Sequence, residues 1–269
     1  MRGLNKRAYS ETLSALIIGA TILAVTLISA EVATYLLENE MQRAEFKEAE
    51  SAMLILADVI EDVATKMLSS GYVKFNCRAG GVDFLNNTVS VQVFIVTDSG
   101  EQCILSEKSS IIRYRGGSSL ADMGDEFLRG TSRSIVFGEA SPLISVRKFF
   151  DGRPIIQLES ASMRVVPTGT LYLQNIGNGT SGYVNVYEVV FIKISIGRVF
   201  GVGSINVKAY SKNVTVTTIF ISQVDFQLKL VVDGYEVVHT VDGADTYNGN
   251  PVVGSLFYVV VVYVEISTV

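Results

Sequence analysis

Residues 13–30 read LSALIIGATILAVTLISA and contain no charged side chain. As a helix, this run is about 27 Å long, close to the ~30 Å hydrocarbon core of a bilayer. Arg2, Lys6 and Arg7 precede the run, and the residue that follows it is Glu31. Because basic residues favour the cytoplasmic side, the sequence predicts a membrane-inserted helix with its N-terminus in the cytoplasm and the remaining chain outside.

Small residues recur within this run at four-residue spacing, as in Ala15 with Gly19 and Ala20 with Ala24. Small residues let neighbouring helices approach closely, so the run also suits packing among similar helices. The alternative is a lone anchor. The residues expected to form the anchor or the core of a helical assembly are Leu13, Leu16, Ile17, Gly19, Ala20, Leu23, Ala24 and Leu27.

The helical pattern continues past the run, because the chain has neither Gly nor Pro from Glu31 to Ser70. This predicts one helix of about 60 residues, or ~90 Å, ended by Gly71. The charged stretch 38–50 is expected to be solvated or loosely packed. Apolar residues three and four positions apart predict a face buried against the rest of the chain, formed by Met53, Leu56, Ile60, Val63 and Met67.

Beyond residue 71 the pattern is that of β-strands separated by turn dipeptides such as Asp233-Gly234. Residues 106–150 are less regular, and we expect them to leave the sheets, with a short helical turn near 120–127. The last predicted strand is apolar on both faces, so it should lie centrally in a core or under a neighbouring subunit. The predicted strands are Val89–Val96, Ile155–Glu159, Met163–Val166, Leu171–Gln174, Tyr183–Ile196, Ile205–Tyr210, Val214–Ile221, Phe226–Val232, Glu236–Val241 and Leu256–Ile266.

The predicted fold class is α+β, with one long N-terminal hydrophobic helix followed by an all-β antiparallel sandwich head. We expect a short leader over residues 1–8 and the helix over 9–70, with an apolar half (13–30) and an amphipathic half (31–70). The head follows over residues 71–269. A division of the head into two β subdomains is the alternative.

The composition argues against several classes of function. The net charge is −5, and no basic stripe is present to neutralise phosphates, so nucleic acid is not an expected partner. The sequence has no motif for acyl or phosphoryl transfer and no cluster of metal ligands, and its one histidine, His239, lies in a strand pattern. We therefore predict no enzymatic activity, no cofactor and no metal.

The two cysteines, Cys77 and Cys103, predict one disulfide if the head faces an oxidising compartment. Two free thiols are the alternative. Three Asn-x-Ser/Thr sequons make Asn86, Asn178 and Asn213 candidate sites of N-glycosylation in a head that lies outside the cell.

Residues 6–11 read KRAYSE and lead directly into the apolar run. Over roughly residues 1–60, the chain resembles archaeal type IV pilins and archaellins, with their class III signal peptide. The resemblance implies that a prepilin-type peptidase removes a leader ending at Arg7-Ala8, which makes Tyr9 the first mature residue. It also implies a β-sandwich head, often glycosylated, displayed on an extracellular filament.

The resemblance leads us to expect a structural subunit of an archaeal filament for adhesion or motility. Such a subunit is stored in the cytoplasmic membrane and then enters a helical homopolymer through the pilus assembly machinery. The alternatives are a single-pass cell-surface protein whose β head binds a sugar or another envelope component, and a membrane-anchored secreted enzyme. A cleaved secretory signal is a further alternative, although the helical pattern continues through the A-x-A-like residues 29–33.

Overall fold

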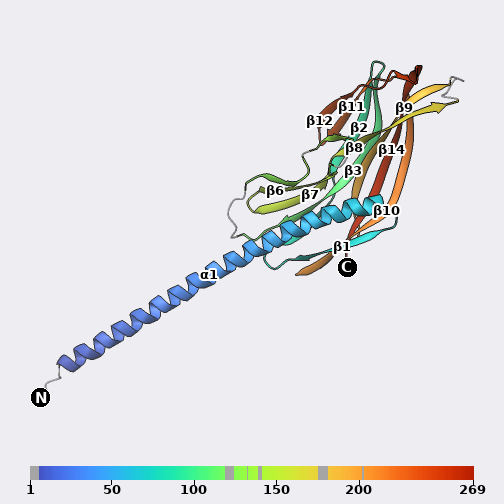
Figure 1. Cartoon of the computed structure of the whole chain (residues 1–269). Coiled ribbons are helices and arrows are strands. Elements are labelled where there is room, and N and C mark those ends of the chain that lie inside the picture. The colour runs from blue at the N-terminus through green and yellow to red at the C-terminus, as the bar shows by residue number, and fades with distance from the viewer. Residues whose placement is uncertain (1–5, 119–123, 132, 139–140, 175–180, 202) are drawn as a thin grey trace.

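The computed structural model describes residues 6–118, 124–131, 133–138, 141–174, 181–201 and 203–269, with side chains from residue 13 onward. The described chain consists of one long helix, α1 (Lys6–Thr65), and a mostly antiparallel β-rich head. The C-terminal half of α1 lies against the head, and its N-terminal half projects away from it (Figure 1). The predicted fold class is confirmed.

The strands of the head form two sheets. The first sheet has the order β1-β10-β14-β9-β8-β5, with β13 paired to β14. Its strands are β1 (Ser70–Asn76), β5 (Ile135–Phe137), β8 (Met163–Leu173), β9 (Gly182–Ile196), β10 (Ser204–Ile221), β13 (Thr246–Tyr247) and β14 (Asn250–Thr268).

The second sheet has the order β12-β11-β2-β3-β7-β6-β4. Its strands are β2 (Gly81–Thr97), β3 (Gly100–Arg115), β4 (Glu126–Arg129), β6 (Ile144–Phe150), β7 (Pro154–Ser160), β11 (Phe226–Val232) and β12 (Tyr235–Val241). Two pairs depart from the predicted antiparallel arrangement, because β14 runs parallel to β9 and β5 runs parallel to β8. The long connection through β10 to β13 lets β14 return in the direction of β9.

Two large apolar cores hold the head together, and a third, small cluster consists of Val184, Val186 and Leu256. In the sandwich core the two sheets face each other, with β2 and β11 of one sheet packed against β9 and β14 of the other. In the helix core α1 packs against both sheets, which supply residues from β1, β9, β10 and β14 on one side and from β3, β6 and β7 on the other. The helix is therefore an integral part of the fold of the head and not an appendage to it.

The strand β14 contributes to both cores, as its apolar sequence predicts. It lies inside its sheet between β10 and β9. Successive side chains of a strand point to opposite faces. Phe257, Val259 and Val261 therefore enter the sandwich core, while Val262 and Ile266 enter the helix core.

The prediction for residues 106–150 is wrong. This segment carries much of β3, with β4, β5 and β6, and Glu126-Phe127 begin a strand where a helical turn was expected. Residues 119–123 lie outside the described part of the chain. The misleading feature is the polar run Ser106–Ser110, which has little β-propensity of its own but is held by pairing with β2. Tertiary pairing overrides local propensity in strands.

The turns and the helix end show how local residues set the chain path. Asp233 and Gly234 have φ of 49° and 85° and join β11 to β12 in the predicted hairpin. The end of α1 differs from the prediction, because the helix stops at Thr65 and not near Ser70. Leu68 takes φ of 60°, and the Ser69 hydroxyl donates to the Lys66 carbonyl at 2.6 Å, which caps the last turn.

Candidate functional site

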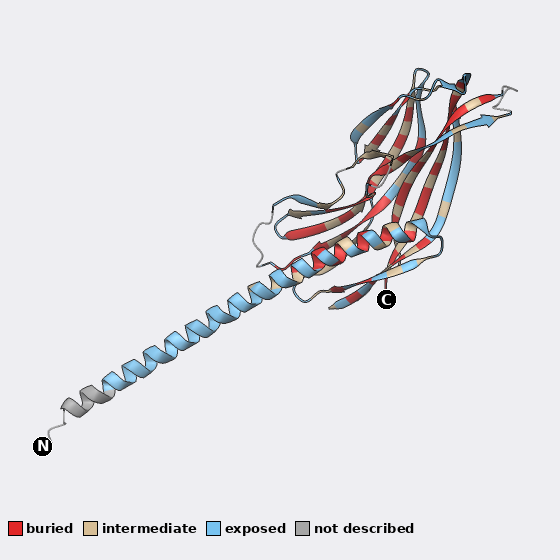
Figure 2. Cartoon of the chain, viewed as in Figure 1, coloured by how far each residue is buried: buried red, intermediate tan, exposed pale blue. Residues whose placement is uncertain are grey.

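The first half of α1 forms a free apolar surface. We call residues 13–37 the apolar rod, and Figure 2 shows this part of the helix exposed on all sides. Its large apolar side chains are 53–69% exposed, and Glu31 is its only charged residue. The helix is long and apolar enough to cross a membrane, with a mean hydropathy of 2.3 over its best window.

The threonine side chains of the apolar rod form hydrogen bonds within the helix. The Thr26 hydroxyl donates to the Ile22 carbonyl at 2.8 Å, and the Thr34 hydroxyl donates to the Ala30 carbonyl at 2.9 Å. Thr21 makes the same bond to Ile17. These bonds satisfy the three threonine hydroxyls without water, which suits a helix placed in lipid or in the interior of a protein assembly.

The predicted anchor and assembly residues lie on this surface. Within the described chain none of them contacts the head, and a Cβ added at Gly19 would meet nothing within 4 Å. Their packing against other helices stays a prediction. The residues concerned are Leu13, Leu16, Ile17, Gly19, Ala20, Leu23, Ala24 and Leu27.

The second half of α1 is buried in the head through the predicted stripe. Met53, Leu56 and Ile60 are fully buried, and Val63 is almost so. Met67 is a correction, because it lies beyond the end of α1 and is 69% exposed. The three-and-four spacing holds only while the chain is helical, and the turn after Thr65 directs Met67 to solvent.

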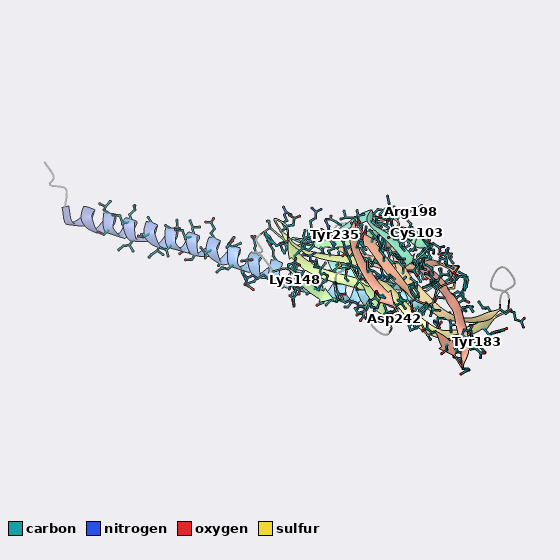
Figure 3. The ribbon with its side chains drawn as sticks, turned by 90° about the horizontal axis from the view of Figure 1, so that it is seen from above. Cys103, Lys148, Tyr183, Arg198, Tyr235 and Asp242 are labelled. Carbon is teal, nitrogen blue, oxygen red and sulfur yellow. The ribbon has the colours of Figure 1, made fainter. Side chains whose placement is uncertain are left out.

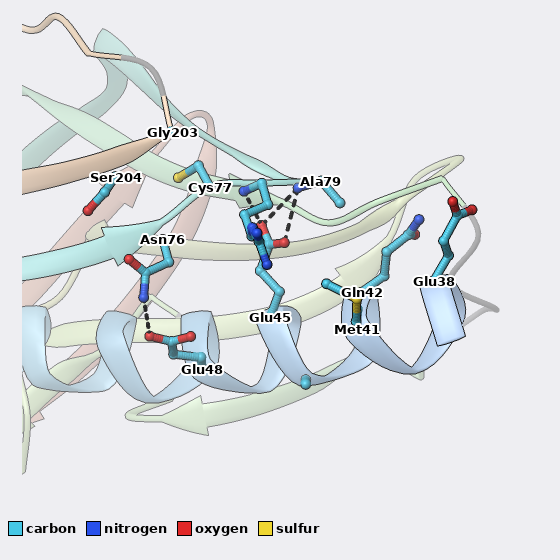
Figure 4. A pocket seen from close by; sticks show the side chains of 12 residues that line it. Glu38, Met41, Gln42, Glu45, Glu48, Asn76, Cys77, Ala79, Gly203 and Ser204 are labelled. Carbon is cyan, nitrogen blue, oxygen red and sulfur yellow. Dashed lines mark hydrogen bonds between the residues drawn. The ribbon is translucent and has the colours of Figure 1, made fainter. Parts of the chain in front are cut away.

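Acidic side chains fasten this half of the helix to the head, and we call Glu45, Glu50, Asp58 and Glu61 the acidic clasp. The carboxylate of Glu45 accepts hydrogen bonds from the backbone N–H groups of Arg78 and Ala79 (Figure 4). It also accepts from the backbone N–H of Gly80 and from the Tyr114 hydroxyl, the latter at 2.7 Å. These four donors lie on the loop after β1 and on β3, so one side chain links the helix to both sheets.

The surroundings of Glu45 set two pKa values. Burial opposes ionisation of Glu45, but the hydrogen bonds from Tyr114 and from the backbone outweigh it and lower the pKa of the carboxyl group. Burial and the bond to the Glu45 carboxylate both raise the pKa of Tyr114. Glu45 is therefore the ionised acceptor and Tyr114 the neutral donor.

The remaining members of the clasp bind residues in and near the strands β4 and β6. Glu50 is 5% exposed and accepts hydrogen bonds from Lys47 at 2.7 Å and from Lys148 of β6 at 3.1 Å. Burial raises its pKa, but the two lysines outweigh this effect and lower it. Lys148 lies at the end of the head from which α1 emerges, opposite the end that carries Tyr183 (Figure 3).

Glu61 holds the chain just before and within β6. Its Oε1 accepts from the backbone N–H groups of Leu143 and Ile144 at 2.7 and 2.8 Å, and its Oε2 pairs with Arg129 at 2.7 Å. Arg129 also pairs with Asp58 on the preceding turn of α1. The sequence led us to expect residues 38–50 to be solvated or loosely packed, and the clasp was missed. Its partners in the head lie 33 to 98 positions away in the sequence, and no local pattern marks them.

A hollow of about 970 Å³ lies beside Glu45, where α1 enters the head. Its lining includes Glu38, Gln42, Glu48 and Cys77 (Figure 4). Burial and the Glu45 charge raise the pKa of the Cys77 thiol, which keeps it protonated and a poor nucleophile. Among the described residues, no group of His, Cys, Asp and Glu is arranged to hold a metal ion.

The predicted disulfide is wrong, because Cys77 and Cys103 are both free thiols. Cys77 lies near Tyr114 at one end of β3, whereas Cys103 lies near the other end of the same strand. The strand between them is roughly 35 Å long. A disulfide needs Cα atoms within about 7 Å, so these two thiols cannot meet in this fold.

The other predicted site residues have separate locations. Arg7, Ala8 and Tyr9 lie in the first turns of α1, where side chains are outside the described part of the structure. Of the sequon residues, Asn86 and Asn213 are exposed on β2 and β10, and Asn178 lies outside the described residues. His239 is exposed on β12 and stacks on Phe137 with ring centroids 4.2 Å apart.

Comparison of the chain with protein families, with curated proteins and with solved structures finds no match.

Proposed function

We propose that this chain is a structural subunit of an extracellular archaeal type IV pilus-like filament, for adhesion or motility, with the apolar rods packed together inside and the β heads outside. The single observation that carries the proposal is the apolar rod itself. It projects from a head that is complete without it, and it exposes large apolar side chains around its whole circumference.

An exposed surface of this kind requires burial in another environment. Burying one large aliphatic side chain contributes about 1.5–3 kcal/mol, and the rod carries more than ten such side chains. A bilayer buries them before assembly, and the rods of other copies bury them in a filament. Apolar burial is retained in both environments, so the transfer from lipid to polymer costs little.

The processing step fits the same scheme. A leader that keeps Lys6 and Arg7 next to the apolar rod would place two charges within the packed core of the filament. Removal of residues 1–8 by a prepilin-type peptidase leaves Tyr9 as the first residue and eliminates this cost.

The second candidate function is a single-pass anchor for a cell-surface binding protein with a β-sandwich ectodomain. The observation in its favour is the charge-free length of residues 13–30, which matches one crossing of a bilayer, with Glu31 and Tyr35 following at the outer interface. Both functions place the head outside the cell, and they differ in whether rods pack against one another.

The variant Gly19→Leu tests whether the rods of different copies pack against one another or whether each rod only anchors its own chain in the membrane. This change keeps the rod apolar, so membrane insertion is retained, but it adds a side chain where close helix approach needs space. We expect cells with the native chain to yield fibres with a helical repeat in negative-stain microscopy. We expect Gly19→Leu to leave the protein in the membrane fraction without fibres.

Leu23→Ile is the matched control, because it alters a neighbouring rod residue at constant volume and should retain fibres. Mass spectrometry of subunits from the fibres should give an N-terminus at Tyr9. Fibres of normal yield in Gly19→Leu would contradict packing through the rod. A native chain that stays in the membrane and never forms fibres would favour the anchor.

A further inference from the structure

The first sheet ends on one side in a strand that is only half paired. The strand β1 pairs with β10 from Ser204 to Tyr210, and the Ser211 N–H donates to the Ser69 carbonyl as the last bond between them. Beyond this point, the described residues place no strand along the outer side of β10. We call residues 213–221 (NVTVTTIFI) the open edge, which is about 30 Å long.

The open edge starts at a β-bulge. Lys212 is the extra residue between Ser211 and Asn213 in the register with β14. From residue 215 to 218 every side chain is exposed, and Val216 is 58% exposed. Figure 2 shows this half of β10 as the exposed border of its sheet. The backbone of the open edge therefore presents unpaired N–H and carbonyl groups together with accessible apolar side chains.

The second sheet also has an unpaired stretch, on β3, and this stretch differs from the open edge of β10 in its charged residues. The strand β7 pairs with β3 only from Ile112 to Arg115, which leaves the earlier part of β3 as an edge. That part carries Glu101, Glu107 and Lys108, and charged side chains are a common protection against edge-to-edge pairing. The open edge of β10 has no charged residue from position 213 to 221.

We propose that the open edge of β10 is an interaction surface for the same segment of a second copy of this chain. The two segments pair antiparallel about Thr217, the midpoint of the open edge, so that each Thr215 lies opposite Ile219 of the other copy. Backbone hydrogen bonds then join the first sheets of two heads into one continuous sheet, which is the mode of strand addition to exposed sheet edges.

The charge pattern favours the antiparallel arrangement. A parallel pair in register would place the two copies of Lys212 side by side, and like charges directly opposite each other are destabilising. In the antiparallel pair the two lysines lie at opposite ends, roughly 30 Å apart. The uncharged, Thr-rich and Ile-rich segment is then self-complementary, as a two-fold contact requires.

This contact goes beyond the proposed polymer. A helical filament is built by head-to-tail contacts, whereas a two-fold contact closes on itself after two copies. The open edge therefore joins subunits of neighbouring filaments. The contact does not depend on the apolar rod, so it holds equally for a membrane-anchored protein.

The sequon at Asn213 bears directly on this surface, because Asn213 is the first residue of the open edge. A glycan on Asn213 would occupy the space that the second strand needs. Pairing and glycosylation at this position therefore exclude each other, and the test uses full-length chain produced in a host that adds no N-glycans.

The test is disulfide trapping of the detergent-solubilised full chain in a Cys77→Ser, Cys103→Ser background. In the proposed register, the two copies of Thr217→Cys face each other with Cα atoms about 4.5–5.5 Å apart, within disulfide range. Val238→Cys on β12 is the matched control, because it is a similarly exposed side chain on an edge strand of the other sheet. We expect covalent dimer at position 217 to exceed the control about tenfold under mild oxidation.

A charge on the open edge supplies the second arm. Adding Thr215→Lys to Thr217→Cys should reduce the dimer to the control level, with an unchanged thermal unfolding transition because Thr215 is exposed. Equal dimer at positions 217 and 238 would indicate association through α1 alone and would overturn the proposal. Dimer that persists in the presence of Thr215→Lys would overturn it as well.

Discussion

Glu45 shows how a single side chain can tie the helix to two distant parts of the head. Three consecutive backbone N–H groups and the Tyr114 hydroxyl all donate hydrogen bonds to its carboxylate. Hydrogen bonds to a charged acceptor contribute about 1.5–3 kcal/mol each when removal leaves donors unpaired. The loop after β1 and the end of β3 are thereby held against the point where α1 leaves the head.

Glu45→Gln should weaken this junction and flatten its pH dependence. The folded-state pKa of Glu45 is lowered, so its contribution is present above the unfolded value of about 4.5 and is lost as pH falls through the folded value. Thermal unfolding at neutral pH should show a loss of about 2 kcal/mol, or roughly 4–8 °C. Between neutral pH and acid below 4.5, the native chain should lose more stability than the variant.

Glu48→Gln is the control for Glu45→Gln. Glu48 lies one turn further along α1 and has a single hydrogen bond from Asn76 at 2.6 Å on an exposed surface. Exposed interactions of this kind contribute little, so the control should keep the native stability at neutral pH. An equal loss in both variants would show that Glu45 has no special role in the junction.

At the scale of elements, the contact between β1 and α1 depends on the absence of a side chain. A Cβ at Gly71 would lie 2.5 Å from Cγ1 of Val59, so β1 approaches the helix more closely than any other residue allows. Gly71 was predicted as the helix stop, but the structure places it in β1, and close packing explains the glycine.

Gly71→Ala should destabilise the protein by about 1–3 kcal/mol, since the added methyl group must displace Val59 or the strand. Adding Val59→Ala should recover part of the loss by making room, and thermal unfolding of the two single variants and the double variant measures this coupling. Gly81→Ala is the control, because a Cβ there meets nothing within 4 Å. Additive effects of the two changes would contradict the contact.

The elements also show what the sequence could predict. The helix, the stripe from Met53 to Val63 and the Asp233-Gly234 hairpin were predicted correctly, because each depends on residues close together in the sequence. The strand β3 was missed, since its middle part, Ser106–Ser110, resembles a loop until β2 pairs with it. The acidic clasp was missed for the same reason, because its glutamates resemble a solvated helix face until the backbone N–H groups of distant loops reach them.

The whole molecule combines a head that has its own apolar cores with a rod that contributes to neither of the two main cores. The helix core takes Phe46, Met53, Leu56 and Ile60 from α1, whereas nothing in either core comes from the apolar rod. A chain beginning at Glu38 keeps every buried residue of α1, and a chain beginning at Ser70 loses all of them. These two truncations test whether the helix belongs to the head.

We expect the chain from Glu38 to remain in solution without detergent and to unfold in one cooperative thermal transition, because the exposed apolar surface has been removed. The chain from Ser70 should aggregate, since removal of three fully buried large side chains alone forfeits roughly 5–9 kcal/mol and exposes the inner faces of both sheets. Circular dichroism melting and sedimentation of the two chains provide the comparison. Equal stability of both would mean that the sheets fold without α1 and that the acidic clasp only docks a helix onto a finished head.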